Sequence, residues 1–149
     1  MKRFLSNICL IFMSLLLAAC QTSKTTPTQS GPSAPLVGTR WQLLSFTSNR
    51  TTNSAVSDSA TNIIFDPSGQ LSGNTGCNNV IASFVQSGEG QLAIFIVNLT
   101  TFTCPNVMQA QEDAVLDGLR NANHYEIEKS QLTIITASGA TTLIFKAVK

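Results

Sequence analysis

The side chains that could carry out chemistry are few in this sequence. It contains a single histidine, His124, with no second histidine and no cysteine or aspartate cluster at the spacing that metal ligands need. Serines are numerous, but none lies in a Gly-x-Ser-x-Gly motif, and one histidine leaves little choice of general base. We therefore expect no catalytic centre, no metal and no cofactor, and we expect His124 at the surface or at a sheet edge.

Two acidic residues, Glu112 and Asp113, are adjacent in a segment with helical periodicity. Neighbours on a helix point in different directions, which argues against a paired acid and base. Residues 107–121 follow a proline and predict one amphipathic helix that packs on a sheet with its acidic residues in solvent. Its apolar stripe consists of Met108, Val115, Leu119 and Ala122.

Four residues of one loop are candidates for a binding or structural role: Gly73, Gly76, Asn78 and Asn79. The two glycines match neither a Rossmann nor a P-loop pattern, because the Lys-Ser/Thr step and a surrounding βαβ unit are missing. Turn glycines beside a bulge or tight loop explain them better. We expect the asparagines to hydrogen-bond their own backbone, as asparagine does in turns, with ligand binding as the alternative.

The first twenty residues have the pattern of an export signal. Lys2 and Arg3 precede an apolar run at residues 8–19 that is too short to span a bilayer. The run ends in Leu-Ala-Ala-Cys at residues 17–20, which resembles the lipobox of bacterial lipoproteins. The resemblance implies cleavage after residue 19, a diacylglyceryl group on the Cys20 thiol and acylation of the new amino group. The alternative is an ordinary secretory signal that happens to contain a cysteine.

A doubly or triply acylated Cys20 would hold the chain on a membrane without a transmembrane helix, because stable anchoring needs more than one acyl chain. Gln21 stands where aspartate commonly marks inner-membrane retention in Gram-negative cells. The resemblance therefore implies an outer-membrane anchor, with the domain in the periplasm if the source is Gram-negative.

Two cysteines, Cys77 and Cys104, remain after Cys9 leaves with the signal and Cys20 carries lipid. In an oxidising compartment the default is a structural disulfide between them. It would close a loop of about 28 residues and contribute about 3.5 kcal/mol in the chain-entropy model. Thiol–disulfide exchange is the alternative, although the pair is not a Cys-x-x-Cys motif.

The remaining chain divides into a tether and one domain. Residues 20–35 hold the lipidated cysteine and a segment with no large apolar residue and three of the five prolines, which predicts a disordered tether. Residues 36–149 are long enough for one domain with its own core. Seven basic and eight acidic residues follow Cys20, so nothing indicates nucleic-acid binding, whose sign is a basic stripe.

Short strands separated by turn residues predict an antiparallel meander rather than βαβ units. A long polar loop is expected at residues 47–61 and a turn at Asp66-Pro67-Ser68-Gly69. The fold class is α+β: a curved antiparallel β-sheet, partly barrel-like, packed by one α-helix. The strands are expected at residues 41–46, 63–65, from 71, at 81–85, 92–97, 99–103, 125–128, 132–136 and 142–148.

Several motifs occur in order along the domain. Gly-Thr-x-Trp lies at residues 38–41, Ser-Gly-x-x-Gly-Cys-Asn at 72–78 and Thr-Phe-Thr-Cys-Pro at 101–105, and Glu112 follows. In this order they resemble the META domain of the HslJ-like heat-shock lipoproteins, and Ser-Gly-x-x-Gly-Cys-Asn is the most specific of them. The similarity covers nearly all of residues 36–145, with departures at Ala82, Phe84 and Phe102, where the family favours glycine, tyrosine and methionine. It implies a small α+β unit in stress-linked envelope proteins, with no established catalytic activity.

Three functions from different classes follow as hypotheses. The first is a monomeric, non-catalytic binding or stress-protective module, held at the membrane and contacting another envelope protein, peptidoglycan or a misfolded client. The second is an inhibitor of an external hydrolase such as a lysozyme or protease, because small stapled β-domains suit rigid loop insertion. The third is a thiol oxidoreductase that uses Cys77 and Cys104.

Overall fold

The computed structural model of the protein describes residues 32–57 and 60–149. The predictions about the signal segment, Cys20 and most of the tether lie outside these residues. Contacts with the folded domain begin at Ser33 and Ala34, just before the expected domain start at Leu36: the backbone N–H of Lys129 donates to Ser33 Oγ (3.2 Å), and the N–H of Ala34 donates to the Lys129 carbonyl (2.7 Å).

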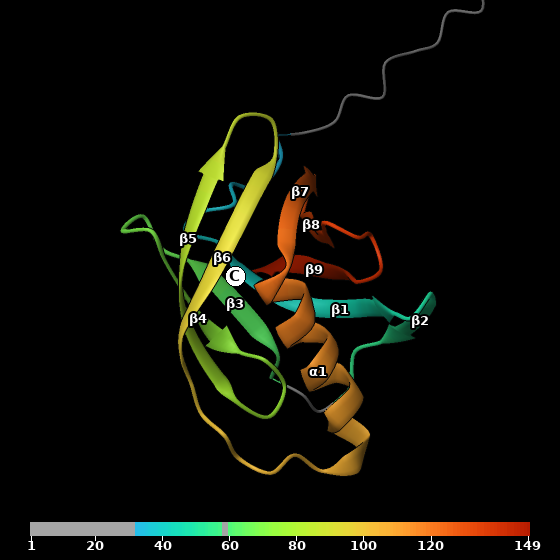
Figure 1. Cartoon of the computed structure of the whole chain (residues 1–149). Helices are drawn as coiled ribbons and strands as arrows, with labels where there is room; N and C mark the ends of the chain where they lie inside the picture. The colour runs from blue at the N-terminus through green and yellow to red at the C-terminus, as the bar shows by residue number, and fades with distance from the viewer. Residues whose placement is uncertain (1–31, 58–59) are drawn as a thin grey trace, which may run out of the picture.

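The domain is an antiparallel sheet of nine strands with one helix (Figure 1). The order is β2-β1-β3-β4-β5-β6-β7-β8-β9, and β1 also pairs with β9, which closes every strand except β2 into a barrel. This confirms the predicted α+β class with a curved, partly barrel-like sheet. The strands are β1 (Arg40–Ser48), β2 (Thr51–Ser54), β3 (Asn62–Phe65), β4 (Gln70–Asn74), β5 (Asn79–Ser87), β6 (Gln91–Leu99), β7 (Ala122–Glu128), β8 (Gln131–Thr136) and β9 (Thr142–Val148); the helix is α1 (Asn106–Arg120).

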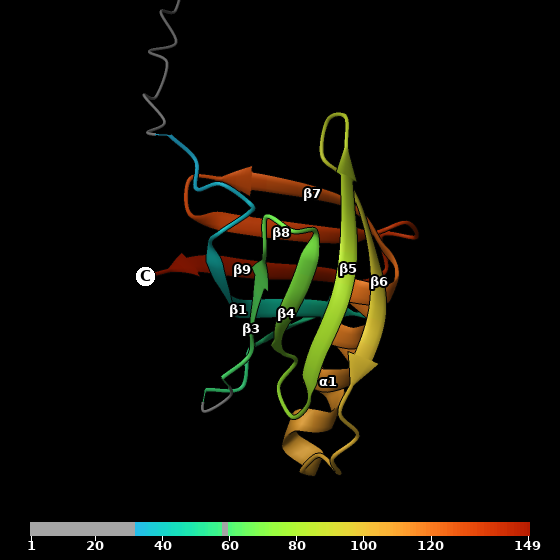
Figure 2. The same cartoon turned by 90° about the vertical axis from the view of Figure 1, so that its left-hand side faces the viewer.

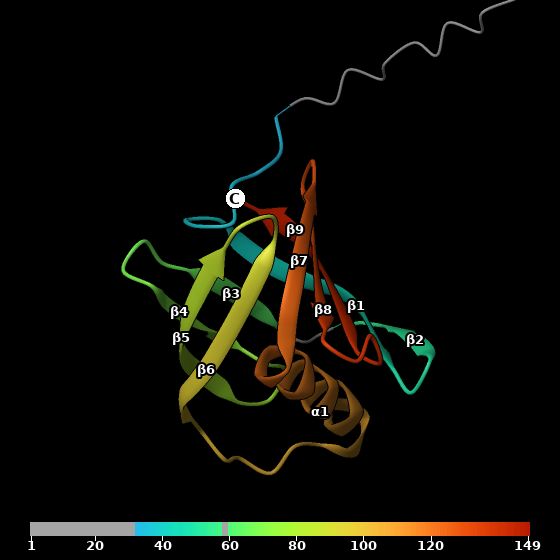
Figure 3. The same cartoon turned by 45° about the horizontal axis from the view of Figure 1, so that its top comes forward.

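The barrel is weakest between β6 and β7. These strands pair at a single position, Gln91 opposite His124, beside a hydrogen bond from the Tyr125 N–H to the Gly90 carbonyl (2.7 Å). Beyond this point the strands diverge, and α1 lies between them (Figures 1 and 3). The helix packs against β6, β1, β8 and β9, so its buried face covers the barrel interior where the strand ladder is missing.

The interior is filled by alternating strand residues and by one face of α1. Trp41 is fully buried, and its indole N–H donates to the Leu36 carbonyl (3.0 Å), which ties the start of the domain to the core. Phe65 and Phe84 meet edge to face with their ring centroids 4.9 Å apart, a favourable aromatic geometry. Burial of these apolar side chains is the main stabilising contribution to the fold.

The predicted turn between β3 and β4 is present. Gly69 has a φ of +84°, and its N–H donates to the Asp66 carbonyl (3.0 Å). The Ser68 N–H donates to Asp66 Oδ1 (2.9 Å), and this bond lowers the pKa of the Asp66 carboxyl below 3.8, helped by the Ser68 hydroxyl.

Two predictions about the strands are wrong. The expected loop at residues 47–61 contains β2, which pairs with the second half of β1 across a turn at Asn49 and Arg50, both with positive φ. The strand expected at 92–97 is present within β6, but the strand expected at 99–103 is not: β6 ends at Leu99, and residues 100–104 leave the sheet. There the Phe102 N–H donates to a side chain, Asn78 Oδ1 (2.7 Å), rather than to a neighbouring strand.

Candidate functional site

The candidate site is centred on Glu112, and the prediction that the acidic residues of the helix lie in solvent is wrong for this residue. Glu112 is 2% exposed. Of its two neighbours in sequence, Gln111 is also buried and Asp113 is exposed. Glu112 follows Met108 by four positions and precedes Val115 by three, so it lies on the apolar stripe of α1. A carboxyl group that helical geometry turns inward needs hydrogen-bond partners there.

Those partners come from the loop between β4 and β5. Thr75 Oγ1 donates to Glu112 Oε1 (2.8 Å), and Asn78 Nδ2 donates to the same oxygen (3.1 Å). The other oxygen, Oε2, accepts the backbone N–H groups of Cys77 (3.0 Å) and Asn78 (3.4 Å). Both carboxyl oxygens therefore accept hydrogen bonds from uncharged donors, and these bonds fix the shape of the loop. We call these four residues, Thr75, Cys77, Asn78 and Glu112, the Glu112 network.

Gly76 is a glycine because α1 comes so close to this loop. Its φ is +129°, and a Cβ at this position would lie 3.0 Å from Gln111 Nε2 and 3.5 Å from Glu112 Oε2. Glycine is required at position 73 for a different reason. Gly73 lies within β4, and a Cβ there would meet the Asn62 carbonyl and come within 2.9 Å of Ile63 Cα. The first glycine permits a left-handed turn against the helix, and the second permits close approach of β3.

Asn78 does not make the local turn bonds that its residue type predicts; its side chain joins two distant segments. It is buried, and its Oδ1 accepts the Thr100 hydroxyl (2.9 Å) and the Phe102 N–H (2.7 Å). The local role belongs to Asn74, whose Oδ1 accepts the Gly76 N–H (2.9 Å) and whose Nδ2 donates to Asn79 Oδ1 (3.2 Å). Asn79 is exposed.

The disulfide predicted between Cys77 and Cys104 is present, with 5.6 Å between the two Cα atoms. It joins the β4–β5 loop to the segment that precedes α1, and both cysteines are half-buried. The Cα separation lies at the preferred value for disulfides. The disulfide therefore adds a covalent link between two segments that the Glu112 network already holds together.

Gln111 binds a second loop in the same way. Its Oε1 accepts the N–H of Val56 (2.7 Å), and its Nε2 donates to Thr61 Oγ1 (2.8 Å). Two consecutive polar residues of α1 thus hold two loops that close one end of the barrel. Sequence reasoning missed both residues because polar residues on a helix normally face solvent; the spacing of Glu112 relative to Met108 and Val115 was the signal that could have identified it.

His124 lies at the junction of β6 and β7. It is half-buried, and its Nε2 is 3.5 Å from Oε1 of the exposed Glu126, which is a surface contact of small energetic value. Within residues 32–57 and 60–149, no three His, Cys, Asp or Glu side chains are grouped so that they could hold a metal ion. None of the helices in this part of the chain is long and apolar enough to cross a membrane.

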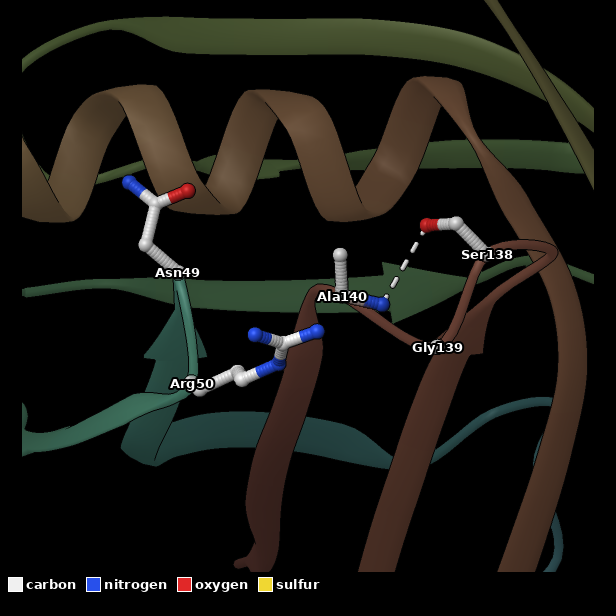
Figure 4. Close-up of a pocket in the computed structure, with 5 residues that line it drawn as sticks. All are labelled: Asn49, Arg50, Ser138, Gly139 and Ala140. Atoms are coloured by element: carbon white, nitrogen blue, oxygen red, sulfur yellow. Dashed lines mark hydrogen bonds between the residues drawn. The ribbon is translucent and has the colours of Figure 1, made fainter.

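The recess shown in Figure 4 lies away from the Glu112 network. It has a volume of about 380 Å³ and is formed by the β1–β2 turn, with Asn49 and Arg50, and the β8–β9 turn, with Ser138, Gly139 and Ala140. Ser138 Oγ already accepts the Ala140 N–H (3.2 Å). A second recess of about 190 Å³ lies where β6 leaves β7, lined by residues that include Ala93 and Asn123. Neither recess exposes the buried carboxyl.

Comparisons with known proteins agree with the fold. A model of the META domain family matches residues 34–149. Among solved structures, an NMR structure of a protein from Burkholderia xenovorans has a TM-score of 0.62 at 20% identity, covering 82% of this chain and 97% of that one. A DUF4847 family protein from Bacteroides vulgatus has a TM-score of 0.55 at 15% identity, covering 74% and 93%. No curated protein matches the chain at a significant level.

Proposed function

The chain belongs to the META domain family, and from this premise we propose that it is a lipid-anchored protein of the bacterial cell envelope with a non-catalytic domain for binding or stress protection. The anchor would be acylated Cys20, joined to the domain by the polar segment that follows it. In a Gram-negative source the domain would lie in the periplasm, at the inner face of the outer membrane.

The observation that carries the non-catalytic part of the proposal is the use made of the buried polar groups. Glu112 is the only buried acidic residue in the described part of the chain, and both of its oxygens accept hydrogen bonds from the loop that it holds. A general acid or base must exchange a proton with a substrate within hydrogen-bond reach. In the Glu112 network the carboxyl instead accepts hydrogen bonds from side chains and backbone N–H groups of the β4–β5 loop, which supports an architectural role.

The disulfide supports the same proposal against a thiol oxidoreductase. Reactive disulfides are strained or exposed, whereas this bond joins half-buried cysteines at an ordinary Cα separation of 5.6 Å. The backbone N–H of Cys77 is also held by Glu112. A rigid, stapled surface at the end of a tether suits the recognition of another envelope component better than it suits redox turnover.

The anchor is tested in a Gram-negative host grown with a labelled palmitate analogue. The full chain and a Cys9→Ser control, which alters only the signal segment, should carry the label and sediment with membranes. The Cys20→Ser variant should carry none. Label on Cys20→Ser, or unlabelled full chain in the soluble fraction, would contradict the anchor. A Gln21→Asp variant should move the protein from the outer to the inner membrane.

Binding is tested by crosslinking in intact cells, with and without heat stress, followed by capture of the protein. The control is the Cys20→Ser variant, which lacks the proposed anchor. We expect specific envelope partners with the anchored chain. Identical background proteins in both samples, at both temperatures, would argue against a binding role.

A further inference from the structure

We propose that the outer face of the β5–β6 hairpin rests on the lipid leaflet to which Cys20 is attached. This inference rests on the proposed lipid anchor and says how the anchored domain is oriented. The hairpin face is defined here by Ile81 and Val85 on β5 and by Phe95 and Val97 on β6.

The hairpin face is apolar although it is exposed. The side chains are 42% (Ile81), 58% (Val85), 59% (Phe95) and 72% (Val97) accessible. They lie close together because β5 and β6 are paired, with Val85 opposite Ala93, and because Val97 follows Phe95 by two positions and so lies on the same face of the strand. Two exposed polar residues share this face, Ser83 opposite Phe95 and Asn98 opposite Ile81. Exposed apolar side chains gathered on one surface, unlike scattered ones, indicate a contact with something.

Charged residues are missing from the strands of this half of the barrel. Strands β3 to β6 contain none, and from Pro67 to Gln111 the only charged residue is Glu89, in the turn of the hairpin. The charged strand residues all lie on the other half of the barrel, on β1, β7 and β9: Arg40, Glu126, Glu128 and Lys146. The strands that carry and adjoin the hairpin face are thus uncharged, and the acidic residues of this half, Asp66 and Glu89, lie in its turns. An anionic partner, which would require exposed cations, does not fit the hairpin face.

The size of the face argues for a lipid surface over a second copy of the chain. Taking about 150–250 Å² for a whole aromatic side chain and less for valine, the four exposed fractions amount to roughly 300–400 Å². A stable dimer needs about 800 Å² from each partner. A small face is sufficient when the other surface is already attached to the same molecule, because tethering raises the effective concentration of the contact.

The tether is long enough and joins the domain at the right end. Cys20 and Ser33 are thirteen residues apart (33 − 20), which span at most about 45 Å when extended. The nine residues of β6 extend over about 30 Å. The described chain begins at the same end of the barrel as the β5–β6 turn (Figures 1 and 2), where Ala34 is bonded to Lys129. The whole hairpin face is therefore within reach of an anchored leaflet.

The test places a tryptophan on each half of the barrel. Residues 20–149, which contain all described residues, are produced with the disulfide formed, and Cys20 is coupled to a maleimide lipid in phosphatidylcholine vesicles that contain brominated chains. Phe95→Trp reports on the hairpin face. Lys146→Trp, on the exposed side of β9, is the matched control, and Trp41 in the core gives a constant background.

We expect bromine quenching to be at least twofold stronger for Phe95→Trp than for Lys146→Trp, and unchanged between about 0.1 and 0.5 M salt, because an uncharged contact is not screened. A Val97→Lys change in the Phe95→Trp background should reduce the difference at least twofold while the melting temperature stays within a few degrees. Equal quenching at the two positions would overturn the proposal. A difference that appears only at high surface density of protein would also overturn it, because the contact would then be with a second copy. The chemical coupling makes the result independent of whether cells acylate Cys20.

Discussion

Replacing Glu112 with glutamine changes one oxygen of the central carboxyl into an N–H₂ group and leaves size and shape almost unchanged. In the structure each carboxyl oxygen faces two donors: Thr75 Oγ1 and Asn78 Nδ2 on one side, and the N–H groups of Cys77 and Asn78 on the other. Whichever way the amide is turned, its N–H₂ group faces at least one N–H donor. No rotamer of glutamine therefore satisfies the loop.

The magnitude follows from the donors that lose an acceptor. A buried donor left without its acceptor costs about 1–3 kcal/mol, with more where the acceptor was charged. One or two such donors give a loss of about 2–4 kcal/mol in the free energy of unfolding. At roughly 4 °C per kcal/mol for a domain of this size, the melting temperature should fall by about 8–16 °C.

The assay is urea and thermal unfolding, followed by far-UV circular dichroism and by the fluorescence of Trp41, the only tryptophan and a fully buried one. The matched control is Asp113→Asn, next in sequence on the same helix but exposed, where the carboxyl accepts Gln109 Nε2 (2.8 Å). This change should stay within about 0.5 kcal/mol. If Glu112→Gln were no more harmful than Asp113→Asn, the carboxyl would not be what holds the loop.

Three further perturbations test other parts of the account. Replacing Cys77 and Cys104 together by serine should lower the free energy of unfolding by about 3.5 kcal/mol, because the sequence separation of 27 residues sets the entropy that the bond removes from the unfolded chain. A loss below about 1 kcal/mol, measured by chemical denaturation, would contradict this. Gly73→Ala should destabilise the domain more than Gly88→Ala does: a Cβ at Gly73 would meet the backbone of β3, whereas Gly88 has open space and only its φ of +52° opposes alanine. Equal melting temperatures for the two variants would refute the close approach. The carboxyl of Asp66 should have a pKa below 3.8, so its contribution to stability is present above that pH and is lost as the pH falls through the lowered pKa. The pKa is measured from the NMR shift of the carboxyl carbon as a function of pH. A pKa at or above 3.8 would contradict the Ser68 hydrogen bond.

The fold was largely accessible from local patterns in the sequence. Alternating apolar residues and the Asp66-Pro67-Ser68-Gly69 turn predicted most strands, and the stripe through Val115 predicted α1. Strand β2 was not predictable by the same means, because its residues Thr51–Ser54 are polar and exposed and gain their structure from pairing with β1. Its existence depends on a partner rather than on its own composition.

Several residues of the candidate site were predicted from the sequence, but Glu112 at its centre was not. The disulfide and the loop glycines follow from residue types, but the reason for Gly76 is a contact with Gln111 of α1, which is 35 residues away in sequence. Asn78 was placed in the correct loop with the wrong partners, since its side chain bonds to residues 100 and 102. Contacts between distant segments decide these roles, and no local pattern encodes them.

The most direct test of the central claim is the intact mass of the protein purified from cell envelopes. A chain that begins at Cys20, carries two or three fatty acyl groups through a diacylglyceryl cysteine, and is lighter by two hydrogens for the bond between Cys77 and Cys104 is the predicted result. A mass equal to the full, unmodified 149-residue polypeptide with reduced thiols would contradict the anchor, the compartment and the function proposed from them.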